Sequence, residues 1–172
     1  MAVKNPMTSC RIGLGYDIHR TKLPANGGAA SVVLGGIEIA APFSLDGHSD
    51  ADVLLHAITD AILGALADHD IGHYFPPGDE KNRNRKSADF LVFALGRMRS
   101  AGYEIANLDC NLICEQPKIA PVRHQLRGAV ADLLGVSIDR VSIKGRTNEK
   151  LDAAGRGEAI ICQAIVLLNE IR

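Results

Sequence analysis

Asp17 and His19 lie two residues apart in the segment GLGYDIHR, directly after an apolar stretch. In an extended backbone, side chains two residues apart point to the same side of the chain. A carboxylate and an imidazole held side by side suit a divalent cation of the zinc or manganese kind. The alternative is an ordinary surface Asp–His pair at the end of a strand, which the pattern taken alone favours.

His56 could complete such a site from a helix. Asp52, His56 and Asp60 recur every four residues and so share one face of a helix predicted over residues 49–69, opposite its apolar stripe. A solvated face is the alternative, but apolar neighbours such as Leu55 are unusual for one. Two histidines and one aspartate with an open fourth position are the ligand count of a catalytic zinc site.

His48 and Ser49 stand just before that helix. The free N–H groups and the dipole at a helix N-terminus favour a phosphate. Ser49, with Asp52 three residues on, is predicted to cap the helix, so any substrate contact by Ser49 would be additional. His48 has no obvious structural task.

Two charged, glycine-containing segments follow in the C-terminal half, at residues 144–150 and 155–158. A lysine at a strand end, hydroxyl and amide side chains, and glycines that allow close approach of the backbone could hold phosphates. An irregular charged turn explains them equally well, because neither a Walker loop nor a dinucleotide-binding spacing is present. The Gln116-Pro117-Lys118 segment is a weaker candidate.

Hydrophobic periodicity predicts the elements that must position these residues. We expect strands at 10–16, 108–115, 141–144 and 159–168, a hairpin over 31–40 around Gly35-Gly36, helices at 49–69, 87–101 and 121–134, and a polar loop at 71–86. This order predicts an α/β fold of the α+β type, with a single layer of helices on one face of a mixed sheet. The open face of the sheet would need a partner, which predicts an oligomer.

The chain has 172 residues, of which 47% are hydrophobic, and a net charge of −1. This predicts a tail at 1–9 and a single domain at 10–172. The charge and the absence of Trp argue against a nucleic-acid partner, and no apolar run is long enough to span a membrane. Each of the four cysteines (Cys10, Cys110, Cys114, Cys162) lies in or beside an apolar stretch, so we predict buried thiols in the reducing cytoplasm.

Taken together, these segments resemble the 2-C-methyl-D-erythritol 2,4-cyclodiphosphate synthase family of the non-mevalonate isoprenoid pathway. The likeness runs from Arg11 to about Leu168. The motifs that carry it are, in order, RIGLGYDIHR, HSDADVLLHAITDAILGAL, DIGHYFP, QPK, and TNEKL followed by GRGE.

The resemblance implies a homotrimer with active sites between subunits. It implies zinc at Asp17, His19 and His56, and a second divalent ion, magnesium or manganese, at the substrate's phosphates. His48 and Thr147 match the catalytic positions that orient the phosphates and stabilise the transition state.

The resemblance also implies which positions contact the substrate, a small cytidine diphosphate compound. These are Asp17, His19, His48, Ser49, Asp70, Ile71, Gly72, Phe75, Pro76, Pro77, Gly78, Asp79, Cys114, Glu115, Gln116, Pro117, Lys118, Ile119, Ala120, Arg146, Thr147, Asn148, Glu149, Ala153 and Arg156. Two segments depart from the family pattern: a Thr-rich run is Arg146-Thr147-Asn148 here, and a Gly-Phe pair is Asp152-Ala153.

The reaction implied is conversion of 4-diphosphocytidyl-2-C-methyl-D-erythritol 2-phosphate to the cyclic diphosphate with release of CMP. The substrate's 2-phosphate would attack its β-phosphorus with metal assistance. Two alternatives remain: a zinc-dependent phosphoanhydride hydrolase, and a nucleotide- or isoprenoid-binding homologue without activity. The absence of an HExxH pattern around His56 counts against the hydrolase.

Overall fold

The computed structural model describes residues 9–25, 30–47, 49–76, 78–82 and 85–171. In these ranges, a five-stranded sheet has the order β4-β1-β7-β5-β6, and a separate two-stranded sheet pairs β2 with β3. The strands are β1 (Cys10–Lys22), β2 (Ala30–Leu34), β3 (Ile37–Ala41), β4 (Ser44–Leu45), β5 (Tyr103–Ile113), β6 (Val141–Arg146) and β7 (Ala159–Glu170). The helices are α1 (Val53–Ala65), α2 (Ile71–Tyr74), α3 (Ser87–Ser100), α4 (Ile119–Leu134) and α5 (Asp152–Gly155), with short 3-10 turns η1 (Glu80–Asn82) and η2 (Ile138–Arg140).

The large sheet is mixed, as predicted. Strand β7 pairs antiparallel with both β1 and β5, whereas β5 and β6 run parallel and are joined through α4. The register aligns Asp17 with Cys162, Cys162 with Leu112, and Leu112 with Gly145. These four residues therefore form one row across the sheet, from β1 at one side to β6 at the other.

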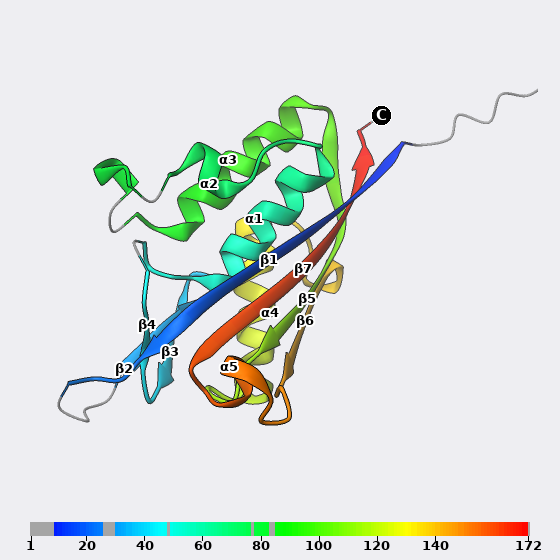
Figure 1. The fold of residues 1–172 in the computed structure, drawn as a ribbon. Coiled ribbons are helices and arrows are strands. Elements are labelled where there is room, and N and C mark those ends of the chain that lie inside the picture. The colour runs from blue at the N-terminus through cyan, green and yellow to red at the C-terminus, as the bar shows by residue number, and fades with distance from the viewer. Residues whose placement is uncertain (1–8, 26–29, 48, 77, 83–84, 172) are drawn as a thin grey trace, which may run out of the picture.

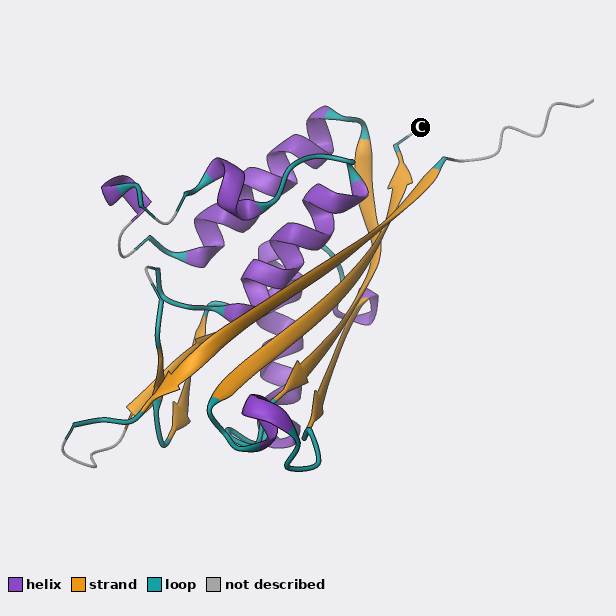
Figure 2. Ribbon diagram, in the orientation of Figure 1, coloured by secondary structure: helices purple, strands orange, loops and turns teal. Residues whose placement is uncertain are grey.

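Helices α1, α3 and α4 lie on one side of the sheet, as Figures 1 and 2 show. Helix α1 packs on β1 and β7, α4 packs on β6, and α3 packs mainly on α1. One apolar core joins these helices to the strands and to the β2–β3 hairpin. The predicted mixed sheet with helices on one face is confirmed, and on the opposite face Ile12, Leu14 and Tyr16 of β1 are exposed.

Helix α1, predicted over residues 49–69, differs from its prediction at both ends and in its surroundings. It begins at Val53, and its N-cap is Asp52, whose carboxylate accepts hydrogen bonds from Leu54 N and Leu55 N. The predicted cap by Ser49 is therefore wrong. Asp52 caps the helix in place of Ser49. Its carboxylate also accepts hydrogen bonds from Gly35 N and Gly36 N, which connects the helix to the β2–β3 turn.

The predicted polar face of this helix is mostly buried and not exposed to solvent. Asp52 is fully buried, and burial raises its pKa to about 6 although several backbone N–H groups oppose that shift. Leu55 and Thr59 are also buried, so α1 is enclosed on nearly all sides. Only His56 and Asp60 on that face stay partly exposed, which marks the point where the site opens.

Two glycines of β1 set the distance between the strand and α1. A Cβ atom on Gly15 would lie 1.8 Å from Ala57 O, and one on Gly13 would lie 1.8 Å from Ala61 O. No larger residue fits at either position without separating the helix from the strand. The close approach brings α1 against the strand that carries Asp17 and His19.

Several boundaries also differ from the predictions. Strand β1 continues to Lys22, so Asp17 and His19 lie within a strand and not after it. The predicted loop 71–86 contains α2 and η1, β5 begins earlier, at Tyr103, and α4 begins at Ile119. The β2–β3 turn falls on Gly35-Gly36 as predicted, and both glycines have positive φ.

Three of the four cysteines are buried and free, as predicted. Cys10 is exposed, because it stands at the outer end of β1. Among the described residues, no helix has both the length and the apolar character needed to cross a bilayer.

Candidate metal centre and substrate site

The strand β1 and the helix α1 bring Asp17, His19 and His56 together. Asp17 Oδ2 lies 3.0 Å from His19 Nε2 and 2.9 Å from His56 Nδ1, and the two ring nitrogens are 3.1 Å apart. All three ligand atoms lie within 4.8 Å of one another, on partly buried side chains. Two imidazole nitrogens and a carboxylate oxygen that converge in this way fit a zinc-like ion.

Local structure explains this convergence. Strand alternation points Asp17 and His19 to the same face of β1, the face on which α1 packs. His19 Nδ1 lies 2.9 Å from Asp46 O, and because a carbonyl only accepts, that nitrogen must donate the proton. The lone pair of a neutral His19 is then on Nε2, the nitrogen that faces Asp17 and His56.

The electrostatics of the three groups favour an ionised Asp17. Burial by itself would raise the pKa of Asp17, but the close contacts of its carboxylate with the His19 and His56 rings outweigh burial and hold the pKa well below its usual range. For His19, burial alone would lower the pKa, and the hydrogen bond to Asp17 outweighs it, so the pKa is raised. The Asp17 carboxylate is therefore ionised and can bind a cation.

The resemblance assigns Ser49, Asp70, Gly72 and the stretch 75–79 to a pocket for the methylerythritol phosphate, and part of this pocket lies beside the cluster. Ser49 Oγ is 3.3 Å from His56 Nε2. The Phe90 ring lies 5.7 Å from the His56 ring, centroid to centroid, and packs against the Phe75 ring at 4.6 Å. Phe75 is therefore one aromatic ring away from the metal candidates.

The loop that carries the remaining residues of this pocket is anchored to α1. Asp60, one turn after His56, accepts a hydrogen bond from Ile71 N at 2.8 Å. Asp70 caps the one-turn helix α2 by accepting from His73 N. Gly72, Pro76, Gly78 and Asp79 are exposed, and His48 and Pro77 lie outside the described residues.

A second group of predicted residues gathers around a small cavity where β6 meets the start of α4. Its lining is Cys114, Pro117, Lys118, Ile119, Ala120, Arg123, Gly145, Arg146 and Thr147. Three cationic side chains therefore surround it. Burial raises the pKa of the Cys114 thiol to about 11, so this thiol stays neutral at pH 7, and its S–H donates to Pro117 O.

The loop after β6 carries the rest of that group. Thr147 Oγ1 donates to Glu149 Oε1 at 3.0 Å. Asp152 has a φ of 53°, in the left-handed region that favours glycine, and this is a position where the family pattern has one. The Asp152 carboxylate accepts from Ala154 N and from Asn148 Nδ2, which stabilises this turn without glycine.

Ala153 and Arg156 line a separate hollow with Ile18 and Arg20 of β1. Arg156 pairs with Glu158 at 2.9 Å on the surface. Glu115 Oε1 is a buried side-chain oxygen without a hydrogen-bond partner among the described residues, and Gln116 is exposed.

Within one chain, the two groups of residues are far apart. Asp17 and Gly145 occupy the two ends of the row across the sheet described above, with Cys162 and Leu112 between them. Three interstrand spacings of about 4.8 Å separate them by roughly 14 Å. Both intervening side chains are fully buried, so packed core lies between the two groups.

A match to the YgbB family covers residues 10–169. This chain belongs to the YgbB family. A relative from Rhodopirellula baltica, named 2-C-methyl-D-erythritol 2,4-cyclodiphosphate synthase, is 48% identical over 159 residues, which cover 92% of this chain and 93% of that protein. A relative of the same name from Rubrobacter xylanophilus is 47% identical over 163 residues, covering 95% and 97%.

Comparison with solved structures supports the same family assignment. IspF from Plasmodium falciparum, solved as a CDP complex, superposes with a TM-score of 0.82 at 37% identity and covers 96% of this chain and 99% of that one. The resemblance inferred from the motifs is confirmed, and the three converging ligands are consistent with the metal site of this family.

Several residues at the site of this YgbB-family chain were not predicted from its sequence. Ser87 Oγ lies 2.8 Å from His56 Nε2, and Asp50 accepts the Ser87 hydroxyl. Phe90 and Arg123 were also missed. Ser87, Phe90 and Arg123 lie outside the family motifs, and Asp50 lies inside one without a role assigned to it. Each joins the site through packing between helices or across a turn, which periodicity does not reveal.

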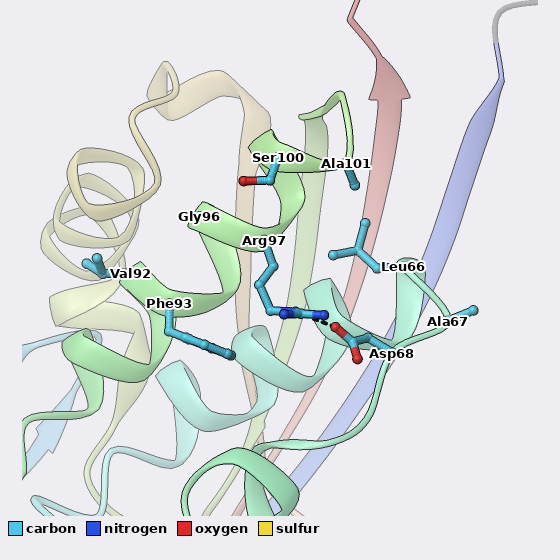
Figure 3. Close-up of a pocket in the computed structure, with 9 residues that line it drawn as sticks. All are labelled: Leu66, Ala67, Asp68, Val92, Phe93, Gly96, Arg97, Ser100 and Ala101. Atoms are coloured by element: carbon cyan, nitrogen blue, oxygen red, sulfur yellow. Dashed lines mark hydrogen bonds and ion pairs between the residues drawn. The ribbon is translucent and has the colours of Figure 1, made fainter.

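A further hollow lies between the end of α1 and the outer helix α3, and Figure 3 shows its lining. Asp68 and Arg97 pair across it. The guanidinium of Arg97 also lies 5.1 Å above the Tyr74 ring. With its one cation paired and stacked, this hollow has the character of a helix–helix junction, and none of the predicted site residues lines it.

Proposed function

We propose that this chain is a metal-dependent 2-C-methyl-D-erythritol 2,4-cyclodiphosphate synthase. Its substrate would be 4-diphosphocytidyl-2-C-methyl-D-erythritol 2-phosphate, and its products the cyclic diphosphate and CMP. The observation that carries the proposal is the convergence of Asp17, His19 and His56 in a chain that aligns over nearly its full length with synthases of that name. Residues 10–172 would act as one catalytic domain, which the single apolar core supports.

Asp17, His19 and His56 would hold a zinc-like ion, and a second ion, magnesium or manganese, would bind with the substrate's phosphates. When bound, these ions supply positive charge that reduces repulsion between the two phosphates and stabilises the transition state. The chain's own task is then to bend the substrate so that its 2-phosphate meets its β-phosphorus. Holding the reacting groups together in this way removes an entropic barrier of up to about 7–11 kcal/mol in favourable cases.

The catalytic roles we assign to His48 and Thr147 are to orient the phosphates and stabilise charge. A strong base is not needed, because the attacking 2-phosphate is already an anion. The exposed Thr147 hydroxyl can turn from Glu149 to a phosphate at little cost, since both partners lie at the surface.

We assign the methylerythritol phosphate to Ser49, to Asp70–Gly72 and to the stretch 75–79. The proximity of Phe75 to His56 through Phe90 supports this assignment. We assign the cytidine and its phosphate to Cys114–Ala120 and Arg146–Glu149, with Ala153 and Arg156 beside them. Three cations around that cavity suit an anionic nucleotide, and IspF from Plasmodium falciparum was solved with CDP.

We propose that the active site forms between chains of a homotrimer. One substrate would have to touch both groups of residues, which the buried core separates within a single chain. The open face of the sheet supplies a surface for assembly, because Ile12, Leu14 and Tyr16 of β1 project from it with exposed fractions of 71%, 66% and 52%. The buried free thiols Cys110, Cys114 and Cys162 agree with a reducing, cytoplasmic setting.

The experiment that tests this function distinguishes a cyclase from a zinc hydrolase. Both would release CMP and both would fail with a chelator, but a hydrolase adds a water oxygen to a product. We expect turnover in oxygen-18 water to leave both products unlabelled, and the second product to weigh one CMP less than the substrate. Label incorporated stoichiometrically into either product would replace the cyclase with the hydrolase, and no CMP release under metal-replete conditions would indicate a binding protein.

A further inference from the structure

The ring of His56 makes a polar contact on the side that faces away from the metal cluster. Its Nδ1 lies 2.9 Å from Asp17 Oδ2, whereas its Nε2 lies 2.8 Å from Ser87 Oγ. Ser87 is the first residue of α3 and is 0% exposed. The start of α3 therefore contacts the one ligand that α1 contributes.

The direction of these hydrogen bonds follows from counting protons. The Ser87 hydroxyl donates to the Asp50 carboxylate, which also accepts from Ser87 N at 3.1 Å. A serine hydroxyl has only one proton, so the Ser87 oxygen can act only as an acceptor towards His56. His56 Nε2 therefore carries a proton and donates it to Ser87, and a neutral His56 then has its lone pair on Nδ1, the nitrogen that faces Asp17 and His19.

We propose that Ser87 and Asp50 are positioning residues for the metal ligand His56. Asp50 orients the Ser87 hydroxyl, and Ser87 holds Nε2–H so that Nδ1 points at the ion. Histidines that bind metals generally donate their other N–H to a protein acceptor, which fixes the ring and raises its basicity. Asp46 O serves the same purpose for His19, so both histidines of the cluster are held from behind.

Ser49 is the competing partner for the same nitrogen. Its Oγ lies 3.3 Å from His56 Nε2, half an ångström farther than Ser87 Oγ, and it accepts from Ala51 N at 3.2 Å. The shorter contact and the full burial of Ser87 make its oxygen, and not that of Ser49, the acceptor of the His56 Nε2 proton. The Ser49 hydroxyl proton is then free for a substrate phosphate.

The test compares two variants, each of which removes one of the two serine hydroxyls near His56 Nε2. We expect Ser87→Ala to weaken zinc binding about 10- to 100-fold, measured by competition with a chelating dye, and Ser49→Ala to change it less than about 3-fold. Zinc affinity is insensitive to a modest loss of fold stability, because the apparent Kd is the intrinsic Kd divided by the folded fraction, which stays near one. Equal affinity in Ser87→Ala and the wild type, or an equal loss in both variants, would overturn the assignment.

The role of Asp50 is tested with a double-mutant cycle. If Asp50 acts on His56 only through Ser87, Asp50→Asn weakens zinc binding alone but adds little in the Ser87→Ala background. Additive losses, or wild-type affinity in Asp50→Asn, would contradict a relay from Asp50 to His56.

Proton NMR of the zinc-loaded protein gives a readout that fold stability does not move. We expect a protected His56 Nε2–H signal in the wild type and in Ser49→Ala, and its loss to solvent exchange in Ser87→Ala. A signal that survives in Ser87→Ala would show that another group accepts this proton. Because every readout is metal binding without substrate, these outcomes do not depend on whether the chain releases CMP.

Discussion

The proposed contact between the Thr147 hydroxyl and a phosphate can be tested by replacing that hydroxyl alone. Thr147→Val keeps the shape of the side chain and removes only the hydroxyl. We expect turnover to fall by about 1–3 kcal/mol of transition-state stabilisation, roughly 5- to 150-fold, as measured by CMP release. Thr147→Ser retains the hydroxyl and serves as the control, and an unchanged rate in Thr147→Val would limit this residue to shaping the loop.

His56 allows the metal centre to be tested directly. We expect the wild type to bind about one zinc-like ion per chain and His56→Ala to retain much less after dialysis, since one of three protein ligands is gone. Elemental analysis measures both. His124, an exposed histidine on α4, provides the matched control His124→Ala, and equal metal content in His56→Ala and the wild type would remove His56 from the ligand set.

At this scale, the sequence reveals ligands more readily than it reveals what holds them. Residue type and spacing suggest Asp17, His19 and His56, and the family motifs support all three. Ser87 lies outside the family motifs, and Asp50 lies inside one without a role that the motif reveals. The contact of Ser87 with His56 depends on how α3 meets α1, and Asp50 acts on Ser87. Asp52 looks from its spacing like part of the polar face, and only its bonds to Gly35 and Gly36 explain why it is buried.

The packing of α1 on β1 sets the distance between two of the metal ligands. Gly15→Ala would place a Cβ atom 1.8 Å from Ala57 O, so the helix must move away from the strand. We expect a loss of about 3 kcal/mol or more in unfolding free energy, at the upper end of overpacking costs, and weaker zinc binding. Denaturant unfolding and zinc titration measure the two effects.

Gly96 in α3 is the matched control for Gly15. No atom lies within 4 Å of a Cβ built at that position, and Gly96→Ala should be neutral or stabilise by up to about 1 kcal/mol through helix propensity. Similar stabilities for Gly15→Ala and Gly96→Ala would mean that the strand and the helix are less closely packed than the structure indicates.

The junction between the end of α1 and α3 makes stability depend on acid pH. Hydrogen bonds from Tyr74, His69 N and Arg97 lower the pKa of Asp68 to about 2, from an ordinary value of 3.8. A depressed pKa in the folded state stabilises the fold above about pH 4, and this contribution is lost as the pH falls towards about 2. We therefore expect Asp68→Asn to show a smaller loss of unfolding free energy between those pH values than the wild type.

Urea unfolding at several acid pH values measures this slope. Asp89→Asn, which removes an exposed carboxylate of α3, is the control and should retain the wild-type slope. An Asp68→Asn slope equal to the wild type would mean that the contacts across this junction (Figure 3) do not bias the ionisation of Asp68.

The elements themselves were largely predictable, and the errors have local causes. The core helices and strands follow from apolar periodicity. Strand β5 was predicted five residues late, because a register shift between Ile105 and Asn107 interrupts the alternation near its start. Strand β1 was predicted to stop at Tyr16, because Ile18 is the one apolar residue among residues 17–22. Pairing with β7 as far as Arg20, and with β4 at Thr21 and Lys22, keeps this segment in the strand.

At the scale of the whole molecule, the two faces of the large sheet differ. Helices α1, α3 and α4 cover one face of the sheet (Figure 1). On the other face, β1 presents the exposed apolar side chains Ile12, Leu14 and Tyr16. The sequence predicted that this face needs a partner. It could not predict that the candidate metal ligands and the cationic cavity proposed for the nucleotide lie at opposite ends of one row across the sheet, since that placement depends on the strand order β4-β1-β7-β5-β6.

Assembly through the open face should therefore be required for activity but not for metal binding. Leu14 is 66% exposed in the middle of the apolar row, so Leu14→Lys adds a charge to the proposed interface without disturbing the core. We expect light scattering to report about three chains for the wild type and a smaller assembly for the variant. Zinc binding should persist, because Asp17, His19 and His56 belong to one chain, while CMP release should fall sharply.

Val92 on the outer helix α3 provides the matched control. It is 61% exposed on the helical side of the molecule, so Val92→Lys introduces the same charge at a similarly exposed apolar position away from the sheet's open face. This variant should keep the wild-type mass and activity. An active monomeric Leu14→Lys protein would contradict a shared active site, because one chain would then bring both groups of residues to the substrate by itself; an unchanged assembly would instead move the interface to another surface.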